Sequence, residues 1–213
     1  MSVPKLTYFA IRGRGELTRL VMAAARKQLE EVTVEFAAWE EMQPATTFGV
    51  LPTLEVNGKE YFQGNAIATY LARENGLYGN TNLDCLMIDQ IVQLKEDILT
   101  VEINTVVGSD QEKIQAAKKL ISDVYPRTMR IFNKFIQENP ANSGFVVGEK
   151  MTLGDLAIFE GTQSCYNNDS DFLSGFPNIM TLREKVAAAE GVKEYLAGRK
   201  SLVPIHSFLY TDI

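Results

Sequence analysis

The chain has 213 residues, of which 46% are hydrophobic and 23% are charged, and its formal net charge is −6. These fractions are typical of a folded globular protein, whereas the acidic balance and the lack of a Lys/Arg cluster argue against a nucleic-acid partner. No apolar run reaches the length of a membrane span and no signal-peptide core follows Met1, so we expect a cytoplasmic protein without a membrane partner.

Cysteine and histidine are scarce, which narrows the possible chemistry. Cys85 and Cys165 lie far apart and His206 is the single histidine, so no spacing typical of a metal site occurs. We therefore expect no metal and two reduced thiols. The same scarcity removes Ser/His and Cys/His nucleophilic machinery. An enzyme with this sequence has to use tyrosine, arginine, carboxylates or a nucleophile that a co-substrate brings.

The first part of the chain predicts a small α/β domain. A β-rich run at 5–9 ends in a Gly/Arg segment at 12–15, and apolar residues at helical spacing over 17–24 predict a helix. The alternation of Val32, Val34 and Phe36 with polar residues predicts a second strand. The polar stretch 39–47 shows no clear pattern.

A predicted hairpin follows this stretch. Strands at 53–56 and 59–62 flank Asn57-Gly58, a pair that accepts the positive φ angles of a type I′ turn. A helix over 66–71 comes next, and Gly76 suits its end. The order strand, helix, strand, short helix, strand, strand, helix is the thioredoxin arrangement. Residues 1–78 therefore predict a thioredoxin-like domain.

Beyond a Gly/Asn-rich linker at about 75–82, residues 83–213 predict an all-helical domain. Apolar residues recur at helical spacing over 83–101 and 114–135, and Pro126 is expected to bend the second of these helices. Thr152 and Asp155 have the spacing of a capping box, which marks the start of a further helix. Strands followed only by helices indicate two domains rather than one mixed sheet.

Several short motifs occur in one order along almost the whole chain. They are Leu6-Thr7-Tyr8-Phe9 with Arg12-Gly13-Arg14-Gly15-Glu16, Trp39, Phe48-Gly49-Val50-Leu51-Pro52-Thr53-Leu54, Gln63-Gly64-Asn65-Ala66-Ile67-Ala68-Thr69-Tyr70-Leu71-Ala72, and the Thr152 capping box. Together they resemble the cytosolic glutathione transferases, and the sigma-like class in particular.

This resemblance implies a fold and a chemistry. The implied fold is an α/β thioredoxin-like N-terminal domain followed by an all-α C-terminal helical domain. The implied protein is a homodimer that uses glutathione as co-substrate, with no permanently bound cofactor, to attack a small hydrophobic electrophile.

The resemblance assigns thiol activation to Tyr8 and Arg14. A free thiol has a pKa of about 8.5, so only roughly 3% is thiolate at neutral pH. A tyrosine hydroxyl aimed at the sulfur stabilises the thiolate, and the arginine adds positive potential. The structural alternative for Tyr8 is an aromatic side chain that only packs at the end of a strand.

The remaining glutathione contacts also come from the resemblance. The implied set is Tyr8, Arg14, Trp39, Gln43, Val50, Leu51, Pro52, Gln63, Gly64, Asn65 and Asp97 of the partner subunit. The backbone of Leu51, before a cis proline, would pair with the cysteinyl part, and the first amides of the helix at Gly64 would hold the γ-glutamyl carboxylate. Trp39 would contact the glycyl end. The alternatives are a proline that simply starts a strand, a core or interface tryptophan, and a solvated helix charge for Asp97.

The acceptor pocket is expected between the domains. Its candidate walls are Phe9, Ile11, Gly13, Leu99 and Asn104. The tail 201–213 either folds over this pocket as a lid or is disordered.

Three positions depart from the family pattern. Gly64 stands where a serine normally binds the γ-glutamyl carboxylate, Gln43 replaces a lysine, and Val50 replaces a polar or basic residue. Losing one hydrogen bond to a charged acceptor costs about 1.5–3 kcal/mol. These departures keep open a non-catalytic binding or structural protein of the crystallin kind.

Two other functions are weighed against the transferase. A glutathione-dependent isomerase such as prostaglandin D synthase is a further alternative, although Asn104 stands where that enzyme has a tryptophan and Gln93 and Glu96 replace aspartates. A thiol-disulfide oxidoreductase is excluded because residues 1–78 contain no cysteine.

Overall fold

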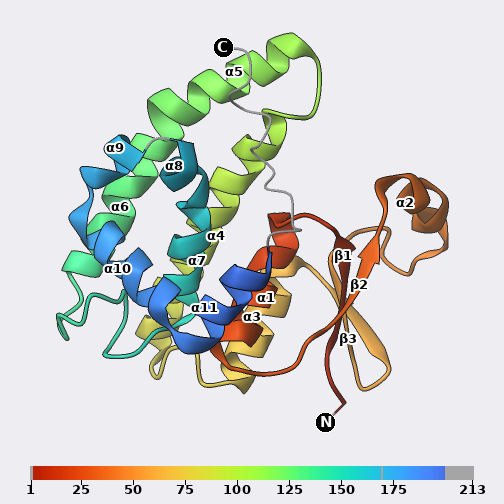
Figure 1. The fold of residues 1–213 in the computed structure, drawn as a ribbon, viewed down its shortest axis with the longest axis horizontal. Coiled ribbons are helices and arrows are strands. Elements are labelled where there is room, and N and C mark those ends of the chain that lie inside the picture. The colour runs from red at the N-terminus through yellow and green to blue at the C-terminus, as the bar shows by residue number, and fades with distance from the viewer. Residues whose placement is uncertain (1, 169, 200–213) are drawn as a thin grey trace. The chain divides into compact units, whose positions relative to one another are not determined.

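A computed structural model gives the fold and describes residues 2–168 and 170–199 (Figure 1). The predicted tail 201–213, with His206, lies outside the described residues. The chain divides into two compact units: residues up to Leu77 together with the segment from Ala189 form the first, and Tyr78–Ala188 form the second. None of the helices in the described part combines the length and hydrophobicity that crossing a bilayer requires.

The first unit is built on a four-stranded sheet with the order β2-β1-β3-β4. Its strands are β1 (Lys5–Phe9), β2 (Glu30–Val34), β3 (Thr53–Val56) and β4 (Lys59–Phe62). Strands β1 and β2 are parallel, and the other neighbouring pairs are antiparallel. Leu6 pairs with Leu54 across β1 and β3, and both side chains are buried. This arrangement confirms the predicted thioredoxin-like fold.

Helices α1 (Glu16–Ala24) and α3 (Gly64–Glu74) pack against each other in the first unit. In Figure 1 the sheet separates them from the short helix α2 (Phe36–Met42). The predicted hairpin turn is confirmed, since Asn57 and Gly58 have φ angles of 52° and 76°.

The predicted extension of the second strand to Phe36 is wrong. Strand β2 ends at Val34, and Phe36 begins α2, which the 3-10 turn η2 (Gln43–Ala45) continues. The Phe36 ring stacks on the ring of Phe9 with centroids 4.3 Å apart. A contact with β1, rather than strand periodicity, therefore accounts for an aromatic residue at this position.

Helix α11 (Glu190–Gly198), the last in the described residues, groups with the first unit, although the sequence placed it in the region 83–213. It packs on α1, beside which it lies in Figure 1. Gly191 permits a very close approach, because a Cβ atom there would come within 2.1 Å of the Ala23 carbonyl oxygen.

The second unit is all-helical in its described part. Its elements are α4 (Asn82–Asn104), α5 (Asp110–Lys119), the π-helical segment η3 (Leu120–Val124), α6 (Tyr125–Gln137), α7 (Leu153–Gly161), α8 (Gln163–Asn168), α9 (Ser170–Ser174) and α10 (Pro177–Ala188). The irregularity expected at Pro126 takes the form of η3, which directly precedes the turn that holds this proline. A proline cannot donate the usual helical hydrogen bond, so the backbone before it has to adjust.

The predicted capping box at the start of α7 is present and buried. The Asp155 carboxylate accepts bonds from the backbone N–H of Thr152 (2.7 Å), the Thr152 hydroxyl (2.9 Å) and the N–H of Val146 (2.8 Å). Asp155 is fully buried. One side chain thus joins the helix start to the preceding loop.

The pKa of Asp155 links this cap to pH. Burial raises the pKa to about 7, against the opposing effect of the bonds from Thr152 and Val146. An unfolded aspartate titrates near about 3.9, so between these values the folded protein binds more protons than the unfolded chain. The part of its contribution to stability that comes from this extra proton is therefore present at low pH and is lost as the pH rises through 7, whereas the hydrogen bonds to Thr152 and Val146 contribute at either pH.

We expect the free energy of unfolding of the wild type, relative to the non-titrating Asp155→Asn variant, to fall as the pH rises. The slope approaches about 1.4 kcal/mol per pH unit between about pH 5 and 7, and it flattens above that window. Urea denaturation of both proteins at several pH values measures this difference. A difference that is constant or rises with pH would contradict the raised pKa.

Candidate functional site

Tyr8 lies near the end of β1 and is held by the turn that follows. Its ring is buried, with 6% of the residue exposed. The backbone N–H of Arg14, in the 3-10 turn η1 (Gly13–Gly15), donates to the Tyr8 hydroxyl at 3.1 Å. A hydroxyl that accepts such a bond is polarised and becomes a better donor itself. The structure thus joins the two residues that the resemblance paired in thiol chemistry.

Gly15 makes this position of the Tyr8 ring possible. A Cβ atom at residue 15 would lie 2.5 Å from Cδ1 of Tyr8, which is far inside van der Waals contact. In the sequence, Gly15 stands out only as part of the Arg12–Glu16 motif. Its position between Arg14 and a helix start was the available signal for a close approach.

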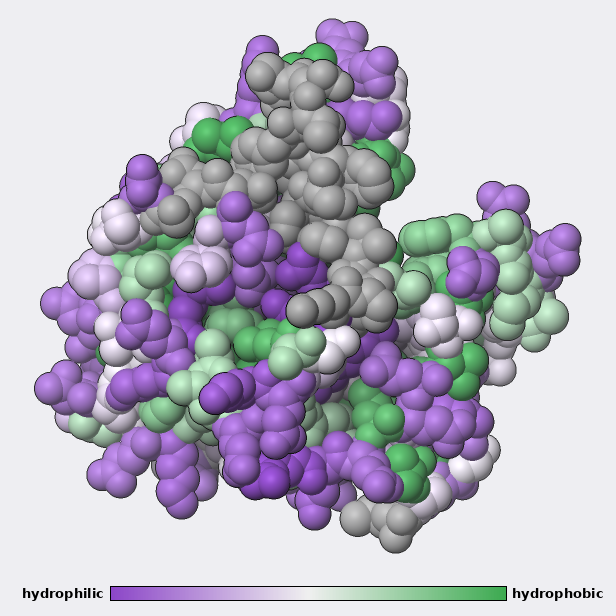
Figure 2. Space-filling model, in the orientation of Figure 1, coloured by the Kyte–Doolittle hydropathy of each residue, from purple (hydrophilic) through white to green (hydrophobic). Residues whose placement is uncertain are grey.

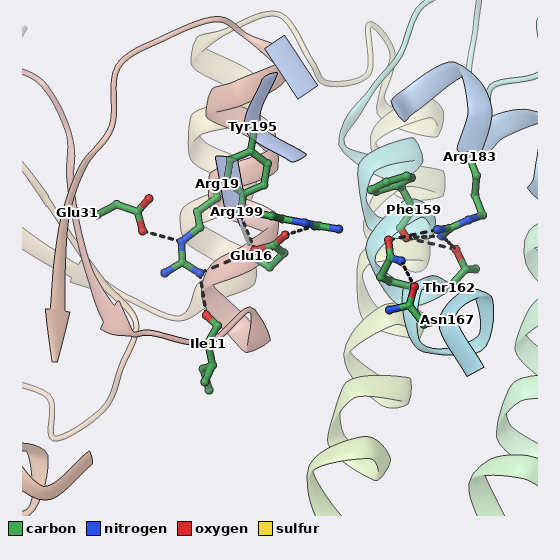
Figure 3. A network of polar contacts seen from close by, with 11 residues as sticks. Ile11, Glu16, Arg19, Glu31, Phe159, Thr162, Asn167, Arg183, Tyr195 and Arg199 are labelled. Carbon is green, nitrogen blue, oxygen red and sulfur yellow. Dashed lines mark hydrogen bonds and ion pairs between the residues drawn. The ribbon is translucent and has the colours of Figure 1, made fainter. Parts of the chain in front are cut away.

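An ion network centres on the buried side chains of Arg19 and Glu16 (Figure 3). The Arg19 guanidinium donates to Glu31 at 2.6 Å and to the Ile11 carbonyl oxygen at 2.9 Å, and it lies 5.9 Å from the centre of the Tyr8 ring. Arg19 therefore ties together α1, β2 and the turn after β1. No sequence signal singled out Arg19, because it falls opposite the apolar stripe of the predicted helix, on the side expected to face solvent.

Glu16 extends the network to α11. The Tyr195 hydroxyl donates to one carboxylate oxygen of Glu16 at 2.7 Å, and Arg199 donates to the other at 2.5 Å. Burial raises the pKa of Tyr195, and the Glu16 charge adds to the rise, so this hydroxyl stays a donor. The acid is fully buried but paired, as a buried charge has to be. The last helix thus supports the helix that follows the Tyr8–Arg14 turn.

The start of α3 meets the same turn. The Leu51–Pro52 peptide bond is cis, as the resemblance implied, and Pro52 is buried. Gln63 is exposed and has a φ of 76°, and Gly64 is the buried first residue of α3. A Cβ atom at Gly64 would lie 2.5 Å from the Arg14 carbonyl oxygen and 3.3 Å from Cγ of Pro52. Arg14, Pro52 and Gly64 are therefore brought together, with Asn65 next to them in the first helical turn.

This packing indicates that position 64 requires a glycine for steric reasons. We expect Gly64→Ser to destabilise the protein by about 1–3 kcal/mol, because the new side chain overpacks a backbone oxygen. We do not expect it to strengthen glutathione binding, since α3 has to move away to admit the side chain. Gly198→Ser is the matched control, because no atom of the described residues lies within 4 Å of a Cβ atom there. Thermal denaturation and calorimetric titration measure both effects, and a stable, tighter-binding Gly64→Ser protein would contradict this expectation.

Trp39 and Phe9 form one aromatic cluster with Phe36. The Trp39 ring meets the Phe9 ring edge-on, with centroids 6.1 Å apart. Figure 2 shows the surface of the α2 region as apolar patches interrupted by hydrophilic side chains. The structure therefore gives Phe9, predicted as an acceptor-pocket wall, a contact with α2.

The other predicted residues are dispersed. Gln43 and Val50 are exposed beside the loop 43–50, Ile11 is half-buried, and Gly13 is buried in η1. Asp97, Leu99 and Asn104 lie on α4 in the second unit, where Leu99 is buried and the other two are exposed. Their assigned parts in glutathione or acceptor binding stay predictions.

Comparison with known proteins places these features in one family. Residues 4–73 match the family described as "Glutathione S-transferase, N-terminal domain", and residues 96–199 match "Glutathione S-transferase, C-terminal domain".

Individual relatives agree over almost their whole length. Probable glutathione S-transferase 6 of Caenorhabditis elegans is 31% identical over 199 residues, which cover 92% of this chain and 96% of that protein. Hematopoietic prostaglandin D synthase of Gallus gallus is 29% identical with the same coverage. The crystal structure of monomeric Na-GST-3 from the hookworm Necator americanus has a TM-score of 0.82 at 25% identity and covers 92% of this chain and 97% of that one.

Proposed function

Because the chain belongs to the glutathione S-transferase family, we propose that it conjugates the glutathione thiolate to small hydrophobic electrophiles, in the manner of a sigma-like transferase. The observation that carries this proposal is the Tyr8 hydroxyl, which is buried at the end of β1 and accepts the Arg14 backbone N–H at 3.1 Å. The curated relative of C. elegans is itself named as a probable glutathione S-transferase.

The chemistry needs a stabilised sulfur anion. A hydrogen bond from Tyr8 to the thiolate lowers the thiol pKa, and a drop of about two units corresponds to ~2.7 kcal/mol and makes the thiolate the major form at neutral pH. The thiolate then attacks the electrophilic carbon, a C–S bond forms, and the leaving group departs with the electron pair of the broken bond. The thiol proton is released to solvent. The positive potential of Arg14 and the N–H bond to Tyr8 favour the anionic sulfur.

Three features support the placement of the peptide. The first amides of α3, at Gly64 and Asn65, favour an anion because of the helix dipole, so we place the γ-glutamyl carboxylate there with Gln63 beside it. The backbone of Leu51 pairs with the cysteinyl residue in the manner of an added strand. Trp39 and Gln43 then face the glycyl end. Asp97 of the partner subunit would contact the γ-glutamyl amine in a homodimer.

Saturation kinetics test this proposal. We expect the conjugation of a nitro-substituted aryl halide to saturate with glutathione in the millimolar range or below, at rates well above the uncatalysed reaction. Measurable glutathione binding without turnover would favour the non-catalytic binding or structural alternative. The absence of both binding and turnover would reject the proposal.

A further inference from the structure

The segment that faces the glycyl end in the proposed complex carries no cation. Between Lys27 and Lys59 the sequence contains no lysine or arginine. The same segment holds exposed glutamates at positions 35, 40 and 41 in and beside α2. A free glycyl carboxylate placed here gains no opposite charge from this part of the chain.

The Gln43 side chain forms a hydrogen bond within its own loop. Its side-chain amide donates to the Gly49 carbonyl oxygen at 2.8 Å. Thr46 closes the loop from the other side, donating its hydroxyl to the Gln43 carbonyl oxygen at 2.8 Å and accepting the Gly49 N–H at 3.0 Å. The residue that stands where the family has a lysine therefore holds the loop 43–49 in shape.

The face of α2 that carries Trp39 also carries an acid. Residues 36, 39, 40 and 43 are spaced by three and four, so they share one side of a helical turn. Phe36 and Trp39 use that side to contact Phe9. Glu40 is the charged residue on it, and its side chain is exposed. The charge nearest to Trp39 on this face is therefore negative.

We propose that this site prefers a γ-glutamylcysteinyl thiol whose terminal glycyl carboxylate is masked as an amide, by ammonia or by a cationic amine, over free glutathione. Glu40 is the specificity-determining residue, and Gln43 occupies the position of the family's lysine without supplying a charge. The inference rests on the proposed function, because it assumes that the glycyl end lies beside α2. Removing one negative charge from the ligand removes its repulsion from Glu40 and leaves a neutral group that Trp39 and the loop can accept.

The expected preference is moderate, because these charges are exposed and screened by water and salt. We expect the KM for glutathione amide to be about 1.5-fold to fivefold lower than that for glutathione at low ionic strength, which is the range that exposed charges of this kind produce. The preference should shrink as salt is added, whereas kcat should be similar for the two thiols because the sulfur is the same.

The test compares kcat/KM for glutathione and for its glycyl amide in the wild type and four variants. Gln43→Lys should reverse the preference by improving glutathione alone, and Glu40→Gln should narrow it. Gln43→Ala, which removes the loop bond without adding charge, should affect both thiols equally. Glu41→Gln, which lies off the Trp39 face, is the matched control and should change the ratio least.

The outcomes distinguish a wrong specificity from a wrong function. If both thiols are conjugated but glutathione is preferred, or if Gln43→Lys improves both equally, the specificity inference is wrong and the transferase proposal stands. If neither thiol is conjugated by any of the proteins, the proposed function itself fails.

Discussion

Replacing Tyr8 by phenylalanine is expected to lower kcat about 10²-fold, which is the effect of removing one donor to a developing or stabilised anion. The aromatic ring remains against Gly15, so the packing of the turn is kept. The hydroxyl is lost from the reacting sulfur, and the Arg14 N–H loses its acceptor. Initial rates with saturating glutathione measure the change.

Tyr195→Phe is the matched control for this variant. It also removes a hydroxyl from the first unit, one that donates to the buried Glu16 at 2.7 Å. We expect it to reduce stability by about 1.5–3 kcal/mol, the usual range for a bond to a charged group, while most of the activity is retained. Equal losses of activity in the two variants would show that Tyr8 acts only through folding, and full activity in Tyr8→Phe would exclude it as the thiol donor.

Asp155→Ala is expected to lower the free energy of unfolding by about 3 kcal/mol or more at neutral pH. The substitution leaves the N–H groups of Val146 and Thr152 without their acceptor inside the protein, at about 1–3 kcal/mol for each buried group. It also removes the Asp155 half of the capping box at the start of α7, whose N-cap is Thr152. For a chain of this length, each kcal/mol corresponds to about 2–4 °C in Tm.

The chain contains its own control for this effect. Thr81 and Asp84 form the same capping box at the start of α4, where the Thr81 N–H donates to Asp84 at 2.9 Å in an exposed setting. Water replaces the lost acceptor there, so Asp84→Ala should cost only about 1 kcal/mol. Urea denaturation measures the loss of unfolding free energy in both variants. Equal losses would mean that burial does not increase the contribution of Asp155 to stability.

Local signals in the sequence predicted most of the fold. Asn57-Gly58 and the Thr152–Asp155 pair each encode their geometry within four residues, and the structure has both. The Phe36 error has the opposite origin, because its stacking on Phe9 depends on a residue 27 positions away along the chain. The periodicity of a single segment cannot predict such a long-range contact.

The main residues of the site were predictable from the sequence, but the long-range contacts that hold them in place were not. Family resemblance pointed to Tyr8 and Arg14, which the structure joins through one hydrogen bond. The Glu16–Tyr195 bond spans 179 residues of sequence, so no local pattern reveals it. The close approach of Gly64 to the Arg14 carbonyl is also a tertiary contact that the sequence does not reveal. It explains the glycine at this position by packing rather than by the loss of a serine.

The most direct test of the central claim is the pKa of the glutathione thiol when bound, measured by the ultraviolet absorbance of the thiolate across a pH titration. Our account predicts a value about two units below the free thiol's 8.5 in the wild type and a return toward 8.5 in Tyr8→Phe. A bound thiol that titrates like the free one in the wild type, or a lowered pKa that survives in Tyr8→Phe, would contradict thiol activation by Tyr8.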